Sequence, residues 1–162
     1  MTILNVSKAS FINLIIIFSI FLLDRLSKLY IVYLDKINNG SEIYQSKFLN
    51  IYLIWNEGIA FGLLAFNDIY YYNSLTGIIV IVTLIIFFFM IKTEGIEKYG
   101  FILILGGSLG NIFDRLYYSA VPDFIDIHYQ NIHWFIFNVA DIFITLGVLL
   151  LIFLELFLKK NK

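Results

Sequence analysis

The sequence predicts an all-α membrane protein: four transmembrane helices with a small extracytoplasmic β-sheet and a short interfacial helix. Two observations carry this prediction. The chain of 162 residues is 60% hydrophobic and only 14% charged, and its mean hydropathy is +0.88. A water-soluble domain of this length could not bury that much apolar surface, so part of its solvent must be lipid. A single proline suits uninterrupted helices. We expect one integral membrane domain over residues 1–162.

Charge and cysteine content exclude several classes of protein. The net charge of −1 provides no basic surface for nucleic acid. The absence of cysteine excludes disulfides, thiolate metal sites and a cysteine nucleophile. Membrane lipids are therefore expected partners and nucleic acid is not.

Four spans are expected, at about residues 11–34, 69–91, 99–117 and 135–158. The first could instead be a secretory signal peptide, because Lys8 precedes an apolar run. No small-residue cleavage pattern follows, and hydrophobicity resumes at Leu29, which favours an uncleaved span. The second carries no charge and is long enough to cross a core of ~30 Å. The third meets Asp114 and Arg115, which then need protein partners rather than lipid.

Lysine placement predicts the orientation of these spans. The two tails and the short middle loop carry Lys8, Lys92, Lys98, Lys159, Lys160 and Lys162, whereas the opposite loops carry only Lys36 and Lys47. The positive-inside rule therefore predicts that both termini are cytoplasmic. Acidic residues from separate segments, Asp24, Asp114, Asp123 and Asp141, would then lie toward the extracytoplasmic face.

The extracytoplasmic loop of about residues 35–68 is long for a four-helix bundle. Its β-branched and aromatic stretch 48–55 predicts one or two short strands at the membrane surface. Residues 65–72 predict the short interfacial helix, because three consecutive tyrosines suit the headgroup zone.

The third span contains a glycine-rich segment that ends in polar residues. Gly106 and Gly110 are four residues apart, so a neighbouring helix can approach one face closely. Asn111 follows one turn later on that face, and Asp114 and Arg115 follow it at i+3 and i+4. These polar residues could belong to a functional site. Alternatively, the glycines serve only helix packing, and Asp114 and Arg115 form an ion pair at the membrane interface.

Asn138 and Asp141 lie at the outer start of the fourth span, three residues apart on one helix face. Asn138 could simply cap the helix, and Asp141 could be a carboxylate stabilised by the helix dipole. An ionisable group within a span costs roughly 3 kcal/mol or more to insert, so a functional role is the default hypothesis.

The loop before the fourth span contains Asp123, Asp126 and His128. In an extended strand Asp123 and Asp126 lie on different sides, so these acids need not act together. Asp126 and His128 are interpreted as solvated loop residues. A metal site made with His133 is conceivable, but the spacing fits no helix face or known ligand pattern, so we expect no metal and no cofactor.

Two further groups lie in the first part of the chain. Asn56 and Gly58 end the predicted strand region, where Asn56 is either a donor to a substrate carbonyl or an ordinary turn residue. Asp24 and Lys28 form an i,i+4 pair, which we interpret as structural. Ser27 beside Lys28 suggests a Ser/Lys peptidase, but i,i+1 residues of a helix do not face each other.

Together these segments resemble the lipoprotein signal peptidase (signal peptidase II) family over nearly the whole chain. The motifs are Asp24-xxx-Lys28, Asn56-x-Gly58-x-Ala60-Phe61, Gly106-Gly-x-x-Gly-Asn111-x-x-Asp114-Arg115, Asp123-Phe124 and Phe137-Asn138-x-Ala140-Asp141. Each is weak alone, but five in this order across four spans are highly specific. Two positions depart from the usual pattern: Ser108 replaces an alanine, and Pro122 replaces an aliphatic residue before Asp123.

The resemblance implies an aspartyl endopeptidase of the bacterial inner membrane. It would cleave diacylglyceryl-modified prolipoproteins before the lipidated cysteine, with Asp123 and Asp141 as catalytic residues. The residues implied to support the site or bind substrate are Asn56, Gly58, Asn111, Asp114, Arg115 and Asn138. Two carboxylates at close range share one proton and can activate water without a metal, and a monomer suffices for this chemistry. We expect the diacylglyceryl chains to lie beside the small-residue face of the third span.

Three alternatives follow from the same residues. Asp114 could pair with Asp141 instead of Asp123, although Arg115 beside it favours steady ionisation. A proton or ion transporter would use the buried acids as a relay, but it requires acids spread across the membrane depth. A purely structural subunit explains the glycines but not the asparagines and acids directed at one outer site.

Overall fold

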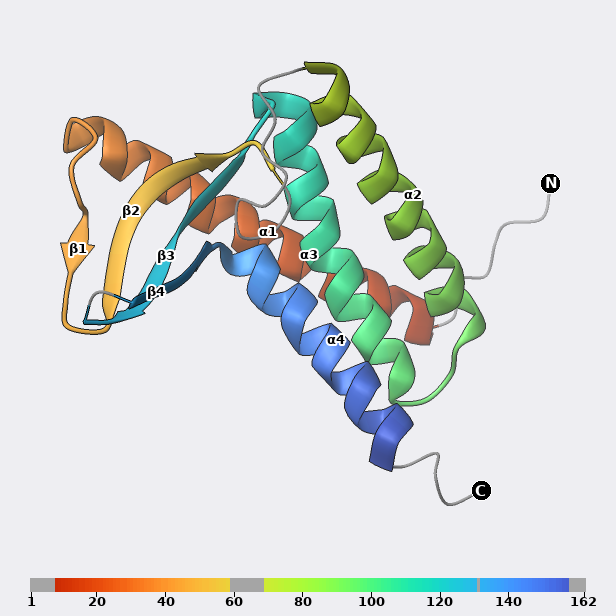
Figure 1. The fold of residues 1–162 in the computed structure, drawn as a ribbon. Helices are drawn as coiled ribbons and strands as arrows, with labels where there is room; N and C mark the ends of the chain where they lie inside the picture. Colours follow the sequence, from red (N-terminus) through yellow and green to blue (C-terminus); the bar gives the residue numbers. More distant parts are fainter. Residues whose placement is uncertain (1–7, 59–68, 131, 158–162) are drawn as a thin grey trace.

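The structure, a computed structural model, describes residues 8–58, 69–130 and 132–157 (Figure 1). In chain order these residues form α1 (Lys8–Ile37), β1 (Tyr44–Gln45), β2 (Leu49–Asn56), α2 (Ile69–Lys92), α3 (Glu97–Tyr118), β3 (Val121–Tyr129), β4 (Ile132–Phe137) and α4 (Val139–Phe157). The predicted combination of four long helices with a small sheet is therefore present.

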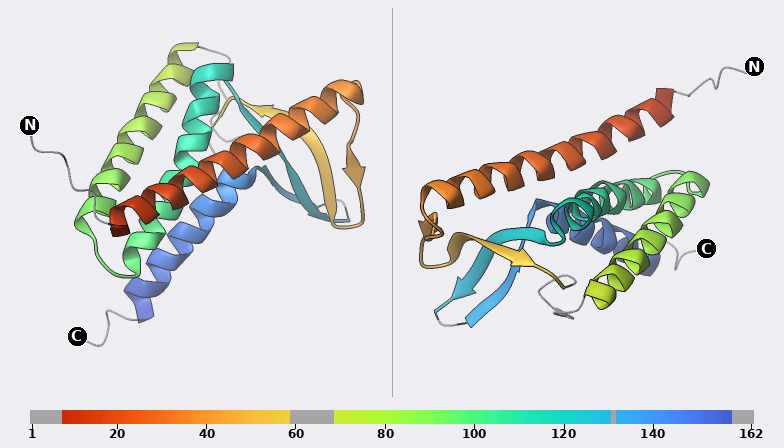
Figure 2. Two further views of the ribbon diagram at one scale, coloured as in Figure 1. Left: turned by 180° about the vertical axis from the view of Figure 1, so that it is seen from behind. Right: turned by 90° about the horizontal axis from the view of Figure 1, so that it is seen from above.

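Helix α3 lies at the centre of the bundle and contacts the other three helices. The start of α1, the α2–α3 connection and the end of α4 lie at one end of the bundle (Figures 1 and 2). The sheet lies at the other end, beside the C-terminal half of α1 and the start of α4. Its residues therefore meet the polar ends of the helices.

Within the described residues, two helices are long and apolar enough to cross a membrane, over Tyr70–Lys92 and Val139–Phe157. Helix α1, with 30 residues, and helix α3, with 22, also have the length for a span. Their charged residues lower their hydropathy, but Asp24, Arg25 and Lys28 of α1 and Asp114 and Arg115 of α3 are buried inside the protein. Most of the large apolar side chains of α2 are exposed, as expected of a surface that faces lipid.

The glycines of α3 allow its neighbours to approach the helix backbone. A Cβ added to Gly106 would lie 2.8 Å from the Cβ of Ile20 in α1. One added to Gly107 would lie 2.5 Å from the backbone oxygen of Ala140 in α4. The predicted close approach to the face of Gly106 and Gly110 is confirmed for α1, and α4 approaches the neighbouring Gly107 as well.

The four strands form one antiparallel sheet in the order β1-β2-β3-β4. Strand β2 confirms the strand predicted over residues 48–55. The sequence interpretation missed β4, so the predicted start of the fourth span was wrong: Phe135–Phe137 belong to β4, and α4 begins at Val139. The apolar strand runs into the apolar helix with only Asn138 between them, so hydrophobicity alone does not mark the boundary.

Some of the predicted features involve residues that the structure does not describe. The first part of the expected interfacial helix, residues 65–68, lies outside the described residues, and Tyr70, Tyr71 and Tyr72 belong to α2. Ala60 and Phe61 of the Asn56 motif, and Lys159, Lys160 and Lys162 of the C-terminal tail, also lie outside them.

Candidate active site

Asp123 lies in β3 and is only 3% exposed. The side-chain amide of Asn56 donates a hydrogen bond of 2.7 Å to its Oδ2, and that of Asn138 donates one of 2.6 Å to its Oδ1. Pairing of β2 with β3 brings Asn56 to this carboxyl group. The sequence analysis placed Asp123 in the loop before the fourth span, whereas it lies in β3, where pairing with β2 helps to bury it.

Asp141 lies in the first turn of α4 and is partly buried. Its Oδ2 accepts a hydrogen bond of 3.1 Å from the backbone N–H of Asn138. Its own N–H donates one of 3.2 Å to Oδ1 of Asn138, so the two residues form a reciprocal helix cap. The other carboxylate oxygen accepts a bond of 2.9 Å from the side chain of Asn111 in α3. Both expected roles of Asn138, helix cap and site residue, are therefore geometrically possible at once.

Asn138 is fully buried and bonds to both acids. Burial and, to a smaller extent, the negative charge of Asp141 raise the pKa of Asp123 from 3.8 to about 7, although the hydrogen bonds from Asn56 and Asn138 oppose the rise. Asp123 therefore holds or releases a proton close to neutral pH.

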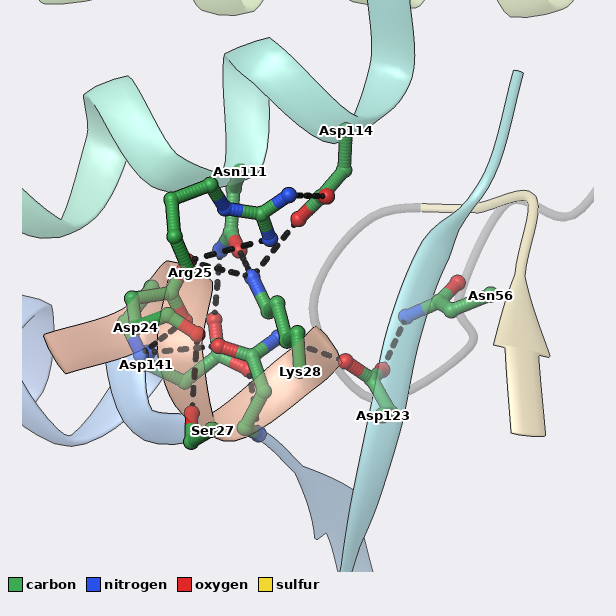
Figure 3. A network of polar contacts seen from close by, with 11 residues as sticks. Asp24, Arg25, Ser27, Lys28, Asn56, Asn111, Asp114, Asp123 and Asp141 are labelled. Atoms are coloured by element: carbon green, nitrogen blue, oxygen red, sulfur yellow. Dashed lines mark hydrogen bonds and ion pairs between the residues drawn. The ribbon is translucent and has the colours of Figure 1, made fainter. Parts of the chain in front are cut away.

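Lys28 lies at the centre of a buried charged network next to Asp141 (Figure 3). Its Nζ donates to Oδ2 of Asp24 at 2.9 Å, to Oδ2 of Asp114 at 2.7 Å and to Oδ1 of Asn111 at 2.7 Å. Asn111 thus accepts from Lys28 and donates to Asp141. The predicted Asp24–Lys28 pair is confirmed, and its lysine is also linked through one side chain to Asp141.

The same network contradicts the alternative interpretation of Asp114 and Arg115 as an ion pair. Asp114 is paired with Lys28 and with Arg25, whose guanidinium lies 2.5 Å from Oδ1 of Asp114. Arg115 instead donates from its guanidinium to the backbone oxygen of Gly58, and it lies over the ring of Tyr72. Arg25 is a site residue that the sequence reasoning did not select. The sequence contained one indication of this role: Arg25 is a second positively charged residue close to Asp24, within an otherwise apolar segment.

Asp24 also fixes the start of α4. Its Oδ1 accepts a hydrogen bond of 3.0 Å from the backbone N–H of Ala140. That N–H belongs to the first turn of α4, where backbone donors lack partners within the helix. Asp24 therefore holds α1 against the helix that carries Asp141.

An apolar pocket of about 450 Å³ opens beside Asp141. It is lined by residues of β3, β4 and α4, namely Ile127, Trp134, Phe135, Phe137, Ile142, Thr145, Leu146 and Asp141 itself. The pocket can accept an apolar chain whose reactive part lies at the Asp141 carboxylate.

Asp126 belongs to a separate cluster. It is fully buried, and its Oδ2 lies 2.8 Å from Nδ1 of His133 and 3.4 Å from the hydroxyl of Tyr52. The side chain of His128 is only 10% exposed. The interpretation of Asp126 and His128 as solvated loop residues was wrong, again because of the missed β3–β4 pairing. The expectation that Asp123 and Asp126 belong to different groups is confirmed.

The site brings three features together. Two acids share one asparagine, one of them titrates near neutral pH, and an apolar pocket lies next to the other. This set can perform general acid–base catalysis on a substrate that is partly apolar.

The chain is similar to known bacterial proteins over most of its length. The family model described as signal peptidase (SPase) II matches residues 16–157. A lipoprotein signal peptidase of Pelagibacter ubique is 50% identical over 96% of this chain and 93% of its own length. One from Anaplasma phagocytophilum is 34% identical over 92% of this chain and 94% of its own length. The fold is similar to a solved bacterial membrane enzyme with a TM-score of 0.72, at 26% identity over 93% of this chain and 90% of that one.

Proposed function

Because the chain belongs to the signal peptidase II family, we propose that it is an intramembrane aspartyl endopeptidase. It removes the signal peptide from diacylglyceryl-modified prolipoproteins and cleaves before the lipidated cysteine. The single observation that carries the catalytic assignment is the binding of Asn138 to both Asp123 and Asp141.

The two aspartates have different roles in catalysis: one is the general acid and the other is the general base. Asp123, whose pKa of about 7 keeps much of it protonated at neutral pH, is the acid. Asp141 is the base, because its two carboxylate oxygens accept bonds from Asn111 and Asn138 that stabilise the ionised form. A water lying between the acids gives its proton to Asp141 as its oxygen attacks the scissile carbonyl.

Product release completes the proton balance. Asp123 donates its proton to the carbonyl oxygen as the tetrahedral intermediate forms, and takes it back when the carbonyl re-forms. Asp141 passes the proton taken from water to the departing amine. The C–N bond breaks, both acids return to their starting states, and no metal or nucleophilic side chain takes part.

Asp114 is less suited to the role of partner for Asp141. Lys28 and Arg25 both bond to it, so it is neutralised by fixed cations and has no need to share a proton. We assign Asp114, with Asp24 and Lys28, to the support of the site. Asn56 and Asn138 hold Asp123, Asn111 holds Asp141, and Arg115 fixes Gly58 at the edge of the site.

The pocket beside Asp141 receives an apolar part of the substrate. The glycine face of α3, where we expected the diacyl chains, is already covered by Ile20 and Ala140, so no room for a lipid remains there. The acyl chains or the signal-peptide core therefore enter between β4 and α4. This position explains why cleavage would depend on lipidation.

The protein crosses the bacterial inner membrane four times as a monomer, with both termini in the cytoplasm. Lysine placement supports this orientation. The position of the sheet, at the end of the bundle opposite the α2–α3 connection, supports an extracytoplasmic site (Figure 1). The substrate would reach the dyad from the outer half of the membrane.

The test is cleavage of a lipidated prolipoprotein by purified protein in detergent or liposomes. Replacing either acid, Asp123→Asn or Asp141→Asn, should reduce the rate by at least about 10²–10⁴-fold, the usual contribution of a general acid or base. Asp35→Asn, which removes a carboxylate near the end of α1, is the matched control and should cleave normally. The unlipidated form should be cut poorly. Full activity in either dyad variant would contradict the assignment.

A further inference from the structure

Strands β3 and β4 bring together three side chains outside the proposed active site. His128 and His133 are directly opposite each other in the β3–β4 register, and their rings stack with centroids 5.1 Å apart. Asp126 lies two residues before His128 on the same strand, so its side chain points to the same face. One ligand atom from each of the three residues can lie within 4.8 Å of the others.

Hydrogen bonding explains only part of this cluster. Asp126 Oδ2 has partners, but Asp126 Oδ1 and His128 Nδ1 are buried and have none in the described part of the chain. A third such atom is Oδ1 of Asn50, which lies opposite Asp126 in the β2–β3 register. Cross-strand neighbours of this kind project from the same face of a sheet. Buried polar atoms are normally satisfied, so several unsatisfied ones at one place indicate a missing partner.

The chemistry of these atoms selects the partner. Two imidazoles and one carboxylate are the ligands of divalent transition metals, whereas Mg²⁺ and Ca²⁺ prefer oxygen alone. Zn²⁺ with bonds of about 2.0–2.2 Å in tetrahedral geometry separates its ligand atoms by about 3.3 Å. Nδ1 of His133 and Nδ1 of His128 lie 2.8 Å and 4.0 Å from Asp126 Oδ2, on either side of that value. Small side-chain rotations would bring both nitrogen–oxygen distances to about 3.3 Å.

We propose that Asp126, His128 and His133 form a three-ligand site for a divalent transition-metal ion such as Zn²⁺, which clamps β3 to β4. The His133 side chain is 53% exposed and provides the route by which the ion enters. A water completes the coordination, as in other three-ligand zinc sites.

The site has a structural role and stands apart from the dyad. Strand β3 carries Asp123 near its start, and β4 leads directly into Asn138. An ion that joins the two strands near their hairpin therefore stabilises the element that holds both proposed catalytic groups. It supplies no water to the reaction, so the proposal does not depend on the peptidase assignment.

Zinc binding can be measured by calorimetry on the full chain, purified without a histidine tag. The chain has only two histidines and no cysteine, so these two residues account for any histidine-dependent binding. We expect one Zn²⁺ per chain and a higher Tm with Zn²⁺ than with EDTA. His133→Gln, a change at an exposed side chain that should fold, should weaken binding at least about 10–100-fold, the range seen even for groups that only support metal ligands. The same change should abolish the Tm shift.

Glu42→Gln is the matched control, because it removes an exposed carboxylate near the same sheet and should bind Zn²⁺ as the wild type does. Asp126→Asn and His128→Gln should behave like His133→Gln. No zinc binding by the wild type, or equal affinity in the wild type and His133→Gln, would overturn the proposal.

Discussion

Asn138 and Asp141 cap each other: the backbone N–H of each donates to the side-chain oxygen of the other, at 3.1 and 3.2 Å. The side-chain amide of Asn138 also donates a hydrogen bond of 2.6 Å to Asp123. One side chain therefore starts α4, orients one acid and holds the other. A substitution there should affect stability and catalysis by different amounts.

Two substitutions at Asn138 separate these effects. Asn138→Ser keeps a capping oxygen but cannot reach Asp123, whereas Asn138→Ala loses both functions. We expect cleavage to fall by about 2–10-fold in both variants, consistent with the loss of a hydrogen bond of about 0.5–1.5 kcal/mol to the protonated Asp123. Only the alanine variant should also lose about 1 kcal/mol of helix capping. Thermal unfolding and cleavage rates measure the two quantities, and equal destabilisation by serine and alanine would refute the capping role.

The pH dependence of cleavage tests the proton on Asp123. This carboxyl group must be protonated to act as the acid, and its pKa is raised to about 7. Activity should therefore fall as the pH rises through about 7, because the proton is lost there.

Asn56 offers a directional test of the same assignment. Its amide donates to the ionised carboxyl of Asp123 and so lowers that pKa. Asn56→Leu should move the alkaline limb of the pH–rate profile to higher pH, in addition to slowing the reaction. Glu57→Gln changes the exposed neighbour and should leave the limb in place. A shift to lower pH in Asn56→Leu would mean that another group controls the limb.

Much of the helical part of this fold could be predicted from the sequence, because a long apolar segment in a chain of this composition has few structures open to it other than a membrane-spanning helix. The β3–β4 hairpin could not be predicted in this way. The last three residues of β4, Phe135–Phe137, are all apolar and lead into an apolar helix, so they were assigned to the span. Because of that error, Asp126 and His128 were interpreted as solvated loop residues. The Asn138 cap was foreseeable, since capping depends on residues three apart, whereas the bonds from Lys28 to α3 depend on how helices pack.

Lys28 should be important for stability. It is 1% exposed and lies against two carboxylates, so Lys28→Met leaves Asp24 and Asp114 with Arg25 as their remaining cation. Breaking a buried ion pair in this way costs about 3–5 kcal/mol. Lys36→Met, at the exposed end of the same helix, should cost less than about 1 kcal/mol. Tm values in one detergent compare the two, and adding Asp114→Asn to Lys28→Met should recover part of the loss.

Helix packing at the site can be tested with glycines. Gly107→Ala places a methyl group 2.5 Å from the backbone oxygen of Ala140, which cannot move without displacing the start of α4. We expect a lower Tm and a slower reaction. Gly77→Ala in α2 meets nothing within 4 Å and should be neutral or slightly stabilising, since alanine favours helix. Comparable losses in the two variants would show that the effect is not one of packing.

The bond from Asp24 to Ala140 joins the first helix to the beginning of the last. Ribosomes make these segments in order, so α1 is in place long before its partner emerges. Throughout that interval Asp24 has no α4 to hold, and Asp141 has not yet been made. A nascent chain that stalls before α4 lacks the proposed base, so we expect hydrolysis to begin only after α4 has been synthesised.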